Sequence, residues 1–190
     1  MLTKEEIRRI VAERKKAITD IQKRNNEVIA KLLRVPEMMT VNTIMMYINT
    51  DDEVNTKFMI AGLFVIGKNI VVPYCEGEDI RLCRLKSWDD LVAGHFGILE
   101  PKIELRELAE RQVHVDELDI VIVPGIAFDP NGGRVGRGKG YYDRFIKKLP
   151  ENTPTIGLAF DCQIFDKVPM NENDQFIKTI ITETQTYTHR

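Results

Sequence analysis

The chain has 190 residues, of which 43% are hydrophobic and 29% charged, and its formal net charge is −2. This length and apolar content suit a single globular domain over residues 1–190 with a substantial hydrophobic core. A nearly neutral chain has no broad basic field, which argues against DNA or RNA as a partner.

Cysteine and histidine usage points to a reducing compartment without a zinc site. The three cysteines are odd in number and none form a Cys-x-x-Cys pair, and the three histidines are scattered. No apolar run is long enough to cross a membrane, and Glu5, Glu6 and Glu13 count against a transit peptide. We therefore expect a cytoplasmic protein that does not bind membranes. Nothing suggests a coiled coil or a broad apolar partner surface, so a monomer is expected.

The N-terminal third reads as helices followed by a strand. Residues 3–33 have the apolar spacing of a helix in two pieces, with Thr19 or Asp20 as a cap of the second. Pro36 is expected to end that second helix. Residues 43–48 are uninterrupted by charge and predict a buried strand.

The middle of the chain alternates between helix and strand signals. Residues 54–66 predict a helix, and 69–72 predict a short β-branched strand that stops before Pro73. Residues 79–85 alternate apolar and polar side chains, as a half-buried strand does. Residues 93–104 contain glycines and a proline and are expected to form a loop.

The C-terminal part contains the clearest strand. Residues 118–123 predict a buried strand, 141–149 a helix, and 155–160 and 178–182 two further strands. Strands that alternate with helices predict βαβ units, an α/β fold and a mostly parallel sheet covered on both faces. Ligands of such folds bind beyond the carboxyl ends of the strands. The segment that follows residues 118–123 lies in that place.

That segment, residues 132–143, reads Gly-Gly-Arg-Val-Gly-Arg-Gly-Lys-Gly-Tyr-Tyr-Asp. Glycine lets main-chain N–H groups approach an anion closely, while Arg134, Arg137 and Lys139 supply positive charge. The helix that follows adds the positive end of its dipole. Asp143 could hold a cation, because Mg²⁺ commonly binds one or two carboxylates together with phosphate oxygens. The composition predicts a phosphate site.

Two common nucleotide motifs do not fit this segment. Residues 133–139 satisfy Gly-x-x-x-x-Gly-Lys, but Gly140 follows where a P-loop needs Ser or Thr, and the segment does not begin directly on its strand. The Gly-x-Gly-x-x-Gly dinucleotide pattern is not matched either. A plain turn explains the first glycines. It does not explain why Gly136, Gly138 and Gly140 alternate with Arg and Lys.

Local sequence alone gives plainer explanations for the other candidates. Two tyrosines that open a helix, Tyr141 and Tyr142, are usually core residues. Asp143 could equally be a first-turn acid that the helix dipole favours. A surface turn, a helix start and a solvated helix face account for the remaining charged candidates, which are Asp174, Glu53, Lys4 and Arg8.

The strand at 118–123, the following Pro-Gly and Ala127-Phe-Asp, and the glycine–tyrosine segment together strongly resemble the 5-formyltetrahydrofolate cyclo-ligase family, also called 5,10-methenyltetrahydrofolate synthetases. The resemblance covers nearly the whole chain, and the glycine–tyrosine segment is its specific part. Val135 departs from the family pattern, which usually has Leu there. The supporting matches are the basic N-terminal helix, Glu53 to Thr56, Gly97 to Pro101, Gln163 before Val168-Pro169, and Asp174.

The resemblance implies a three-layer α/β/α, Rossmann-like sandwich. It also implies an ATP- and Mg²⁺-dependent enzyme that converts 5-formyltetrahydrofolate to 5,10-methenyltetrahydrofolate. ADP and phosphate would be released, by way of an imidate-like phosphorylated formyl group. Such a site needs positioning and charge neutralisation rather than a nucleophile.

The family's functional residues carry over by position. ATP would be bound by Lys4, Arg8, Arg134, Val135, Gly136, Arg137, Gly138, Lys139, Gly140, Tyr141 and Tyr142. The residues implied to be catalytic are Arg137, Lys139 and Tyr141. The folate would contact Ile48, Glu53 and Tyr141, and Mg²⁺ would be held by Asp143 and Asp174. For Lys4, Arg8, Glu53 and Asp174 these roles rest on the resemblance and replace the plainer local explanations.

Two rival functions share parts of this pattern. A sugar-phosphate isomerase or CoA-transferase-like enzyme on the same fold would need no ATP, and an isomerase would want a base that the glycine segment lacks. A non-catalytic nucleotide-binding module could keep the glycines but would have no reason to keep both Asp143 and Asp174. ATP-dependent turnover separates the three.

Overall fold

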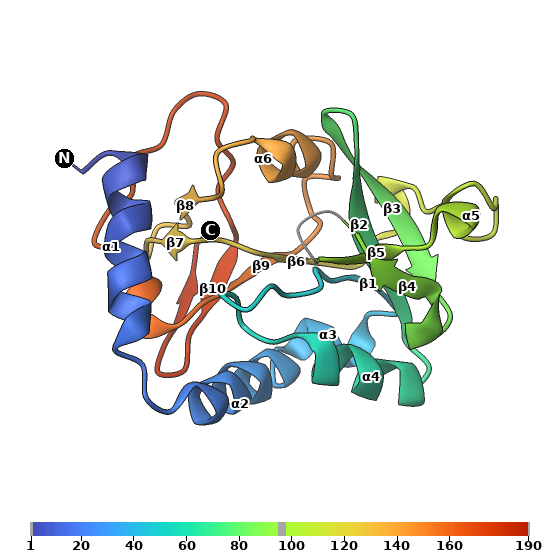
Figure 1. The fold of residues 1–190 in the computed structure, drawn as a ribbon, viewed down its shortest axis with the longest axis horizontal. Helices are drawn as coiled ribbons and strands as arrows, with labels where there is room; N and C mark the ends of the chain where they lie inside the picture. Colours follow the sequence, from blue (N-terminus) through green and yellow to red (C-terminus); the bar gives the residue numbers. More distant parts are fainter. Residues whose placement is uncertain (1, 95–97, 190) are drawn as a thin grey trace.

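A sheet of seven strands runs through the middle of the molecule (Figure 1). The computed structural model describes residues 2–94 and 98–189. Across the sheet the strands lie in the order β11-β10-β9-β6-β1-β2-β3; the neighbours from β10 to β2 are parallel, and the edge strands β3 and β11 are antiparallel. The prediction of a mostly parallel sheet is confirmed. These strands are β1 (Thr43–Met45), β2 (Asn69–Glu76), β3 (Asp79–Leu85), β6 (Ile120–Val123), β9 (Thr155–Leu158), β10 (Thr179–Ile181) and β11 (Thr186–Thr188).

Helices cover both faces of the sheet, as the three-layer prediction requires. One face carries α2 (Ile21–Leu33), α3 (Pro36–Thr40) and α4 (Lys57–Val65), and the other carries α6 (Tyr141–Ile146) (Figure 1). Side chains of a strand alternate between faces, so a strand between two helical layers is apolar on both sides. β6 shows this directly, because its residues divide alternately between the two cores.

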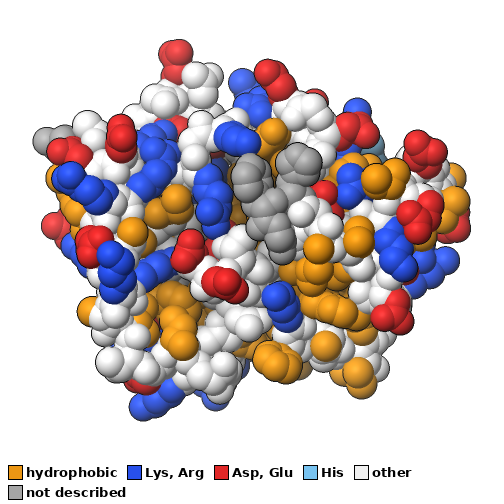
Figure 2. Space-filling model, viewed as in Figure 1, with side chains coloured by type: hydrophobic (Ala, Val, Ile, Leu, Met, Phe, Trp, Pro, Cys, Tyr) orange, Lys and Arg blue, Asp and Glu red, His pale blue; other side chains and the backbone are white. Residues whose placement is uncertain are grey.

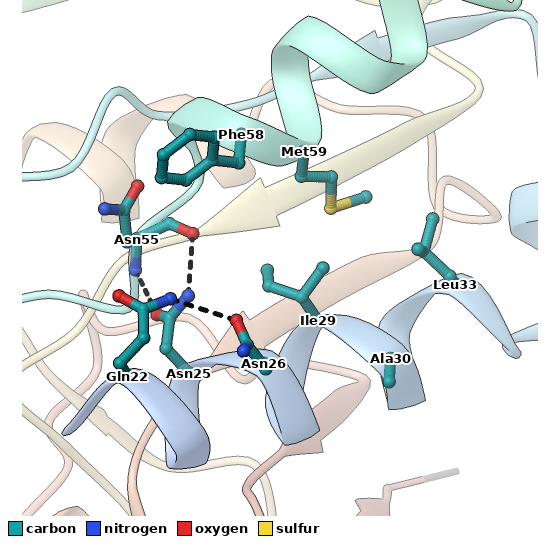
Figure 3. A pocket seen from close by; sticks show the side chains of 9 residues that line it. All are labelled: Gln22, Asn25, Asn26, Ile29, Ala30, Leu33, Asn55, Phe58 and Met59. Atoms are coloured by element: carbon teal, nitrogen blue, oxygen red, sulfur yellow. Dashed lines mark hydrogen bonds between the residues drawn. The ribbon is translucent and has the colours of Figure 1, made fainter. Parts of the chain in front are cut away.

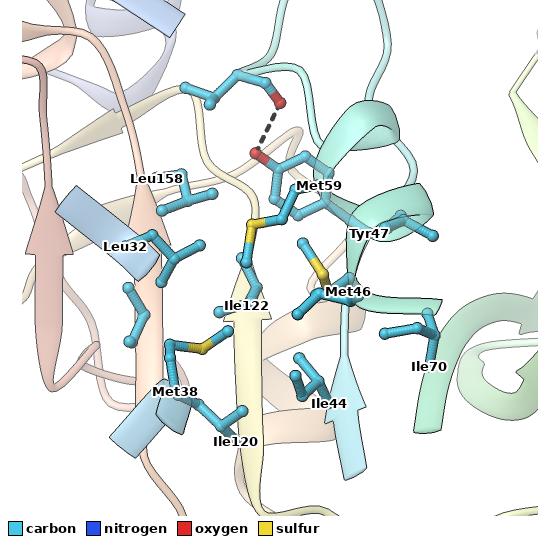
Figure 4. Packing of buried hydrophobic residues seen from close by; sticks show 14 of the residues in the cluster. Leu32, Met38, Ile44, Met46, Tyr47, Met59, Ile70, Ile120, Ile122 and Leu158 are labelled. Atoms are coloured by element: carbon cyan, nitrogen blue, oxygen red, sulfur yellow. Dashed lines mark hydrogen bonds between the residues drawn. The ribbon is translucent and has the colours of Figure 1, made fainter. Parts of the chain in front are cut away.

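The larger core lies under the layer of α2, α3 and α4. Leu32, Met38 and Met59 point from these three helices toward Ile120 and Ile122 of β6 (Figure 4). Burying an aliphatic side chain of this size contributes about 1.5–3 kcal/mol. This packing fixes the helices against the sheet and so fixes the carboxyl ends of the central strands.

A separate helix, α1 (Lys4–Lys16), stands against a two-stranded ribbon made of β7 (Ala127–Phe128) and β8 (Arg134–Val135). Thr3 begins the helix through a capping box with Glu6. On its inner face Ile7 and Val11 are buried in a small cluster with Val135. This contact brings Arg8 of α1 beside the glycine-rich segment.

The prediction that Pro36 ends the second helix is wrong. α2 already ends at Leu33, and Pro36 is the first residue of α3. Proline suits this position because a first-turn N–H has no partner within the helix. Asp20 is the N-cap of α2, although its side chain makes no capping hydrogen bond.

Two predicted strands also differ by three or more residues at one end. β1 covers 43–45 rather than 43–48, although the Met46 N–H still donates to Val71 O at 2.9 Å. β2 does not stop before Pro73 but continues to Glu76, with Pro73 opposite Leu82 of β3. β1 pairs with β2 only through Asn69–Val71, so the missing N–H of Pro73 interrupts no bond on that side.

The expected loop at 93–104 contains regular structure. β4 (Leu91–Ala93) pairs with β5 (Leu99–Pro101), and α5 (Ile103–Arg106) follows. Gly97, which the expected loop includes, lies outside the described residues. Short 3₁₀ turns lie at Trp88–Asp90, Val115–Glu117 and Asp161–Gln163. Within the described chain no helix is long and apolar enough to span a membrane.

Candidate active site

The glycine-rich segment leaves the carboxyl end of β6, forms the β7–β8 ribbon and leads into α6. Asp129, 2% exposed, organises its first turn by accepting hydrogen bonds from the N–H groups of Asn131, Gly133 and Val168. Gly140 has φ 68° and is the N-cap of α6. Because L-residues avoid this left-handed conformation, glycine permits the tight entry into the helix. The predicted placement of this segment beyond a strand end is therefore what the structure shows.

Two cation–carboxylate pairs border the segment. Arg134, which is buried, donates from Nη2 to Asp143 Oδ1 at 2.8 Å, and Lys4 Nζ lies 2.5 Å from Asp174 Oδ2. The main-chain N–H of Gln175 also donates to Asp143 Oδ1, at 3.2 Å. Since Gln175 follows Asp174 in the chain, this bond places the main chain next to Asp174 at the Asp143 carboxylate. The fold thus joins α1, β8, α6 and the segment before β10 at one place.

These two carboxylates fit a magnesium ion that also binds a nucleotide. In each pair a single carboxylate oxygen accepts the hydrogen bonds described here: Oδ1 of Asp143 and Oδ2 of Asp174. Among the described residues no group of three or more His, Cys, Asp or Glu side chains could hold a metal ion by itself. Mg²⁺ commonly takes only one or two carboxylates and completes its shell with phosphate oxygens and water. A two-carboxylate site beside a phosphate-suited segment has that chemistry.

Arg8 joins α1 to the glycines. Its Nε donates to Gly136 O at 2.9 Å, and a Cβ placed on Gly138 would lie 3.3 Å from its Nη2. Any side chain at Gly138 would therefore press on the guanidinium, and its φ of 98° already favours glycine. The Val135 side chain, by contrast, is buried in the cluster under α1, so only its main chain can face a ligand.

Arg137 connects the glycine segment to the chain after β1. Its Nη2 donates to Thr50 Oγ1 at 2.9 Å and lies 3.5 Å from Glu53 Oε1. Glu53 is held from the other side, because its Oε2 accepts from the Thr50 N–H at 2.9 Å. Ile48, buried at the end of the same extended stretch, lies just before this loop. Glu53, a predicted folate residue, thus contacts Arg137, a predicted phosphate residue.

The two tyrosines at the start of α6 have different surroundings. Tyr141 OH donates to Gly77 O at 3.1 Å, and the Arg144 guanidinium lies 5.3 Å from the centre of its ring. Arg144 also donates to Lys139 O at 3.1 Å, which ties the exposed Lys139 to the helix. Burial, assisted by the Glu53 carboxylate, raises the pKa of Tyr142 well above its ordinary value. Tyr142 therefore stays a neutral phenol, packed between the Arg134 guanidinium and the core.

Sequence reasoning missed four residues that shape this site. They carry polar groups that support a predicted residue rather than forming a motif, so local pattern gives little sign of them. Asp129 lies in the stretch that resembles the family, but no role was predicted for it, although an acid that opens a Pro-Asn-Gly turn is a fair signal for main-chain hydrogen bonds. The four are Thr50, Asp129, Arg144 and Gln175.

The chain is similar to known proteins over nearly its whole length. The model of the 5-formyltetrahydrofolate cyclo-ligase family matches residues 1–183. The 5-formyltetrahydrofolate cyclo-ligase of Escherichia coli (strain K12) is 26% identical over 184 residues, which cover 94% of this chain and 99% of that protein. The probable 5-formyltetrahydrofolate cyclo-ligase of Caenorhabditis elegans is 30% identical over 177 residues, which cover 88% of this chain and 85% of that protein. The NMR structure of Aquifex aeolicus 5,10-methenyltetrahydrofolate synthetase superposes with a TM-score of 0.83 at 30% identity, covering 100% of this chain and 94% of that one.

The fold and these whole-chain matches define an α/β enzyme of the ligase class. The chain belongs to the 5-formyltetrahydrofolate cyclo-ligase family, as the glycine–tyrosine segment predicted. A further solved structure, a 5,10-methenyltetrahydrofolate synthetase from Mycoplasma pneumoniae, shares the fold with a TM-score of 0.74 at 21% identity.

Proposed function

We propose that this enzyme uses ATP and Mg²⁺ to cyclise 5-formyltetrahydrofolate to 5,10-methenyltetrahydrofolate, with release of ADP and phosphate. The observation that carries the proposal is the convergence of cationic side chains and two carboxylates on the glycine segment. Family membership supports the folate substrate, and the glycines and helix start support a polyphosphate. The nearly neutral chain favours small-molecule substrates over nucleic acid. Lys4 pairs with Asp174 and Arg8 bonds to Gly136 O, while the other three cations, Arg134, Arg137 and Lys139, belong to the segment itself.

The reaction would proceed in two steps. The formyl oxygen attacks the γ-phosphorus of ATP as the bond to ADP breaks, and the formyl group becomes an imidate-like phosphate. Nitrogen 10 of the folate then attacks the formyl carbon and loses its proton, and phosphate leaves with the former formyl oxygen. The protein must hold two anionic substrates in line and neutralise charge on the moving phosphoryl group.

Each part of the site suits one of these tasks. Arg137 and Lys139 are exposed beside the glycines and would meet the transferred phosphoryl group. Glu53 offers an acceptor for the donor-rich edge of a pterin, and Tyr141 would help to place the formyl group. When bound, Mg²⁺ supplies charge neutralisation at the phosphates, and Asp143 and Asp174 are the residues that would hold it.

The test is an absorbance assay for methenyltetrahydrofolate formed from 5-formyltetrahydrofolate, with and without Mg-ATP. We expect product only when ATP and Mg²⁺ are both present, and none after chelation by EDTA. Well-folded protein that binds ATP but makes no product would contradict the proposed reaction. Protein that does not bind ATP at all would favour the isomerase-like rival.

A further inference from the structure

The loop that carries Glu53 runs from β1 to α4, and α2 fastens its far end. Asn25, 6% exposed, accepts a hydrogen bond from the Asn55 N–H at 2.6 Å through Oδ1 and donates from Nδ2 to Asn55 O at 3.3 Å (Figure 3). Val54, between Glu53 and Asn55, is 1% exposed. These contacts fix the chain on the C-terminal side of Glu53.

Lys15 holds the loop on the other side of Glu53. It lies near the end of α1, and its Nζ donates a hydrogen bond to the main-chain oxygen of Asp52, the residue before Glu53. In Figure 1 the chain that follows β1 runs toward α1. The Asp52 side chain is exposed, so this contact depends on the path of the main chain. Lys15 therefore acts on the backbone that places Glu53.

The Lys15 side chain is partly buried, unlike that of its neighbour on the helix. Lys16 is 71% exposed, as a solvated lysine is. Burial lowers the pKa of Lys15, and nearby acidic groups, among them the Asp52 and Glu53 carboxylates, counteract this effect. Withdrawing an ammonium from water costs free energy unless a polar partner compensates. The partners of Lys15 are the loop's main-chain oxygen and the negative charge around it.

Three cations of α1 reach three different parts of the candidate site. Lys4 pairs with Asp174, Arg8 donates to Gly136 O, and Lys15 contacts the loop after β1. Because they are four and seven positions apart, they lie on one face of the helix. Lys and Arg side chains gather over α1 and beside it in Figure 2. At the usual rise of a helix, Lys4 and Lys15 are about 16 Å apart along the axis. One helix thus connects the proposed phosphate site to the proposed folate loop.

We propose that Lys15 is a positioning residue, which fastens the loop backbone to α1 and so holds Glu53 in place for the folate. The inference rests on the proposed function, which assigns Glu53 to the folate. Arg137 Nη2 lies 3.5 Å from Glu53 Oε1 and approaches it from the glycine segment. The two cations hold the loop from two elements, and Lys15 need not touch either substrate.

The test is calorimetric titration of the full chain with 5-formyltetrahydrofolate and, separately, with Mg-ATP. The variants are Lys15→Met, Lys15→Arg and the control Lys16→Met. Methionine keeps a long apolar side chain without the ammonium, whereas arginine keeps the charge and the donors. We expect Lys15→Met to weaken folate binding about fivefold and to leave ATP binding unchanged. Lys15→Arg should recover most of the folate affinity, and Lys16→Met should bind both ligands like the wild type.

A double-mutant cycle with Glu53→Ala separates positioning from a general effect on the fold. If Lys15 acts through Glu53, Lys15→Met should cause no further loss of folate affinity once residue 53 is alanine. A residue that only stabilises the fold would cause the same loss in both backgrounds.

Four results would overturn the inference alone. They are folate binding by Lys15→Met that equals the wild type, an equal loss of ATP binding, an undiminished effect in the Glu53→Ala background, and a Lys15→Arg variant as weak as Lys15→Met. Failure of the proposed function looks different, because the wild type itself would then bind no 5-formyltetrahydrofolate or form no methenyltetrahydrofolate. A wild type that binds no folate would overturn both.

Discussion

Arg134 and Lys139 lie in one short segment but are held very differently. The Arg134 side chain is 4% exposed and forms a buried pair with Asp143. Lys139 is exposed, and its main-chain oxygen accepts a hydrogen bond from Arg144. Breaking a buried pair leaves an uncompensated charge and destabilises the fold, whereas truncating an exposed lysine does not. Lys139 is therefore the residue at which the proposed function can be tested apart from the stability of the buried pair.

Lys139→Ala should abolish turnover and leave the fold intact. The proposed reaction needs positive charge at the transferred phosphoryl group, and the substitution removes it without opening the core. The measurements are Mg-ATP-dependent formation of methenyltetrahydrofolate and the temperature of thermal unfolding. Lys147→Ala, at an exposed lysine on the far end of α6, is the matched control and should keep full activity. Turnover like that of the wild type in Lys139→Ala would remove this segment from the reaction.

Glu53→Ala should chiefly weaken folate binding and spare ATP binding. A carboxylate that accepts hydrogen bonds from a ligand is worth about 1.5–3 kcal/mol, so we expect a loss of tenfold or more in folate affinity. Calorimetric titration with each ligand measures both effects. The neighbouring Asp52→Ala, at an exposed side chain, serves as the control. Equal losses for the two ligands would show that Glu53 acts only by placing Arg137.

The entry into α6 depends on one backbone conformation. Gly140 has φ 68°, and a Cβ there would lie 2.9 Å from Arg144 Nη1. Arg144 in turn reaches Lys139 O, Glu78 O and the ring of Tyr141. The conformation of Gly140 thus sets the position of the residues that would meet the phosphates.

Gly140→Ala should lower both stability and activity, whereas Gly67→Ala should lower stability alone. Both glycines have positive φ, and the left-handed conformation costs an L-residue about 1–2 kcal/mol. Gly67 ends α4, and an added Cβ there meets no atom within 4 Å, so it carries the backbone cost without the contact with Arg144. Chemical denaturation and the turnover assay distinguish the two effects. Equal activity in the two variants would mean that the start of α6 tolerates displacement.

The strongest sequence patterns predicted their elements, and the shortest elements escaped prediction. Ile120–Val123 is apolar at every position and followed by Pro-Gly, so a buried strand was the only good fit. β7, β8 and β11 are two or three residues long, and their pairing is decided by contacts that no local period records. β2 continues through Pro73 because β1 pairs with it only as far as Val71, whereas β3 pairs with it along its whole length. The lengths of neighbouring strands are a property of the sheet and not of the local sequence.

The residues of the candidate site were also predictable only in part. The glycine segment could be recognised as a candidate site because glycine that alternates with arginine and lysine suits an anionic ligand. Lys4 and Asp174 had no such meaning locally, since they are 170 residues apart in the chain and meet only in the fold. Only the family resemblance pointed to them. Their roles and those of the other predicted site residues remain predictions, now with a geometry that experiments can address.

Far from the site, one ion pair ties the two ends of the region between β3 and β6 together. Arg111, 7% exposed, donates from Nη1 to Asp90 Oδ2 at 2.6 Å and to Arg84 O at 3.0 Å. Burial alone would raise the pKa of Asp90, but hydrogen bonds from Arg111 and from two main-chain N–H groups outweigh it. They hold the pKa of Asp90 below its ordinary value of 3.8. The pair therefore stabilises the ionised carboxylate.

Asp90→Asn should destabilise the whole molecule in a pH-dependent way. A depressed folded-state pKa adds stability above the unfolded value of 3.8, and this stability is lost as the pH falls through the folded pKa. At neutral pH we expect a loss of about 1–3 kcal/mol, because the buried guanidinium loses its charged partner. Urea unfolding from pH 7 to pH 3 measures the difference between variant and wild type. It should be constant down to the unfolded pKa and shrink below it; a difference independent of pH, or one as large in the exposed control Asp116→Asn, would contradict this account.

The contact between Lys4 and Asp174 also has a consequence in time. A ribosome adds about 5–20 residues each second, so Lys4 is made on the order of 10–30 s before the carboxylate that it meets. Toward the end of that interval the glycine segment has been made but lacks the segment that completes its surroundings. A nascent or prematurely terminated chain would thus hold much of the sheet and yet be unable to assemble the full site. Synthesis of Asp174, rather than formation of the core, would therefore decide when the proposed ATP-dependent site can form.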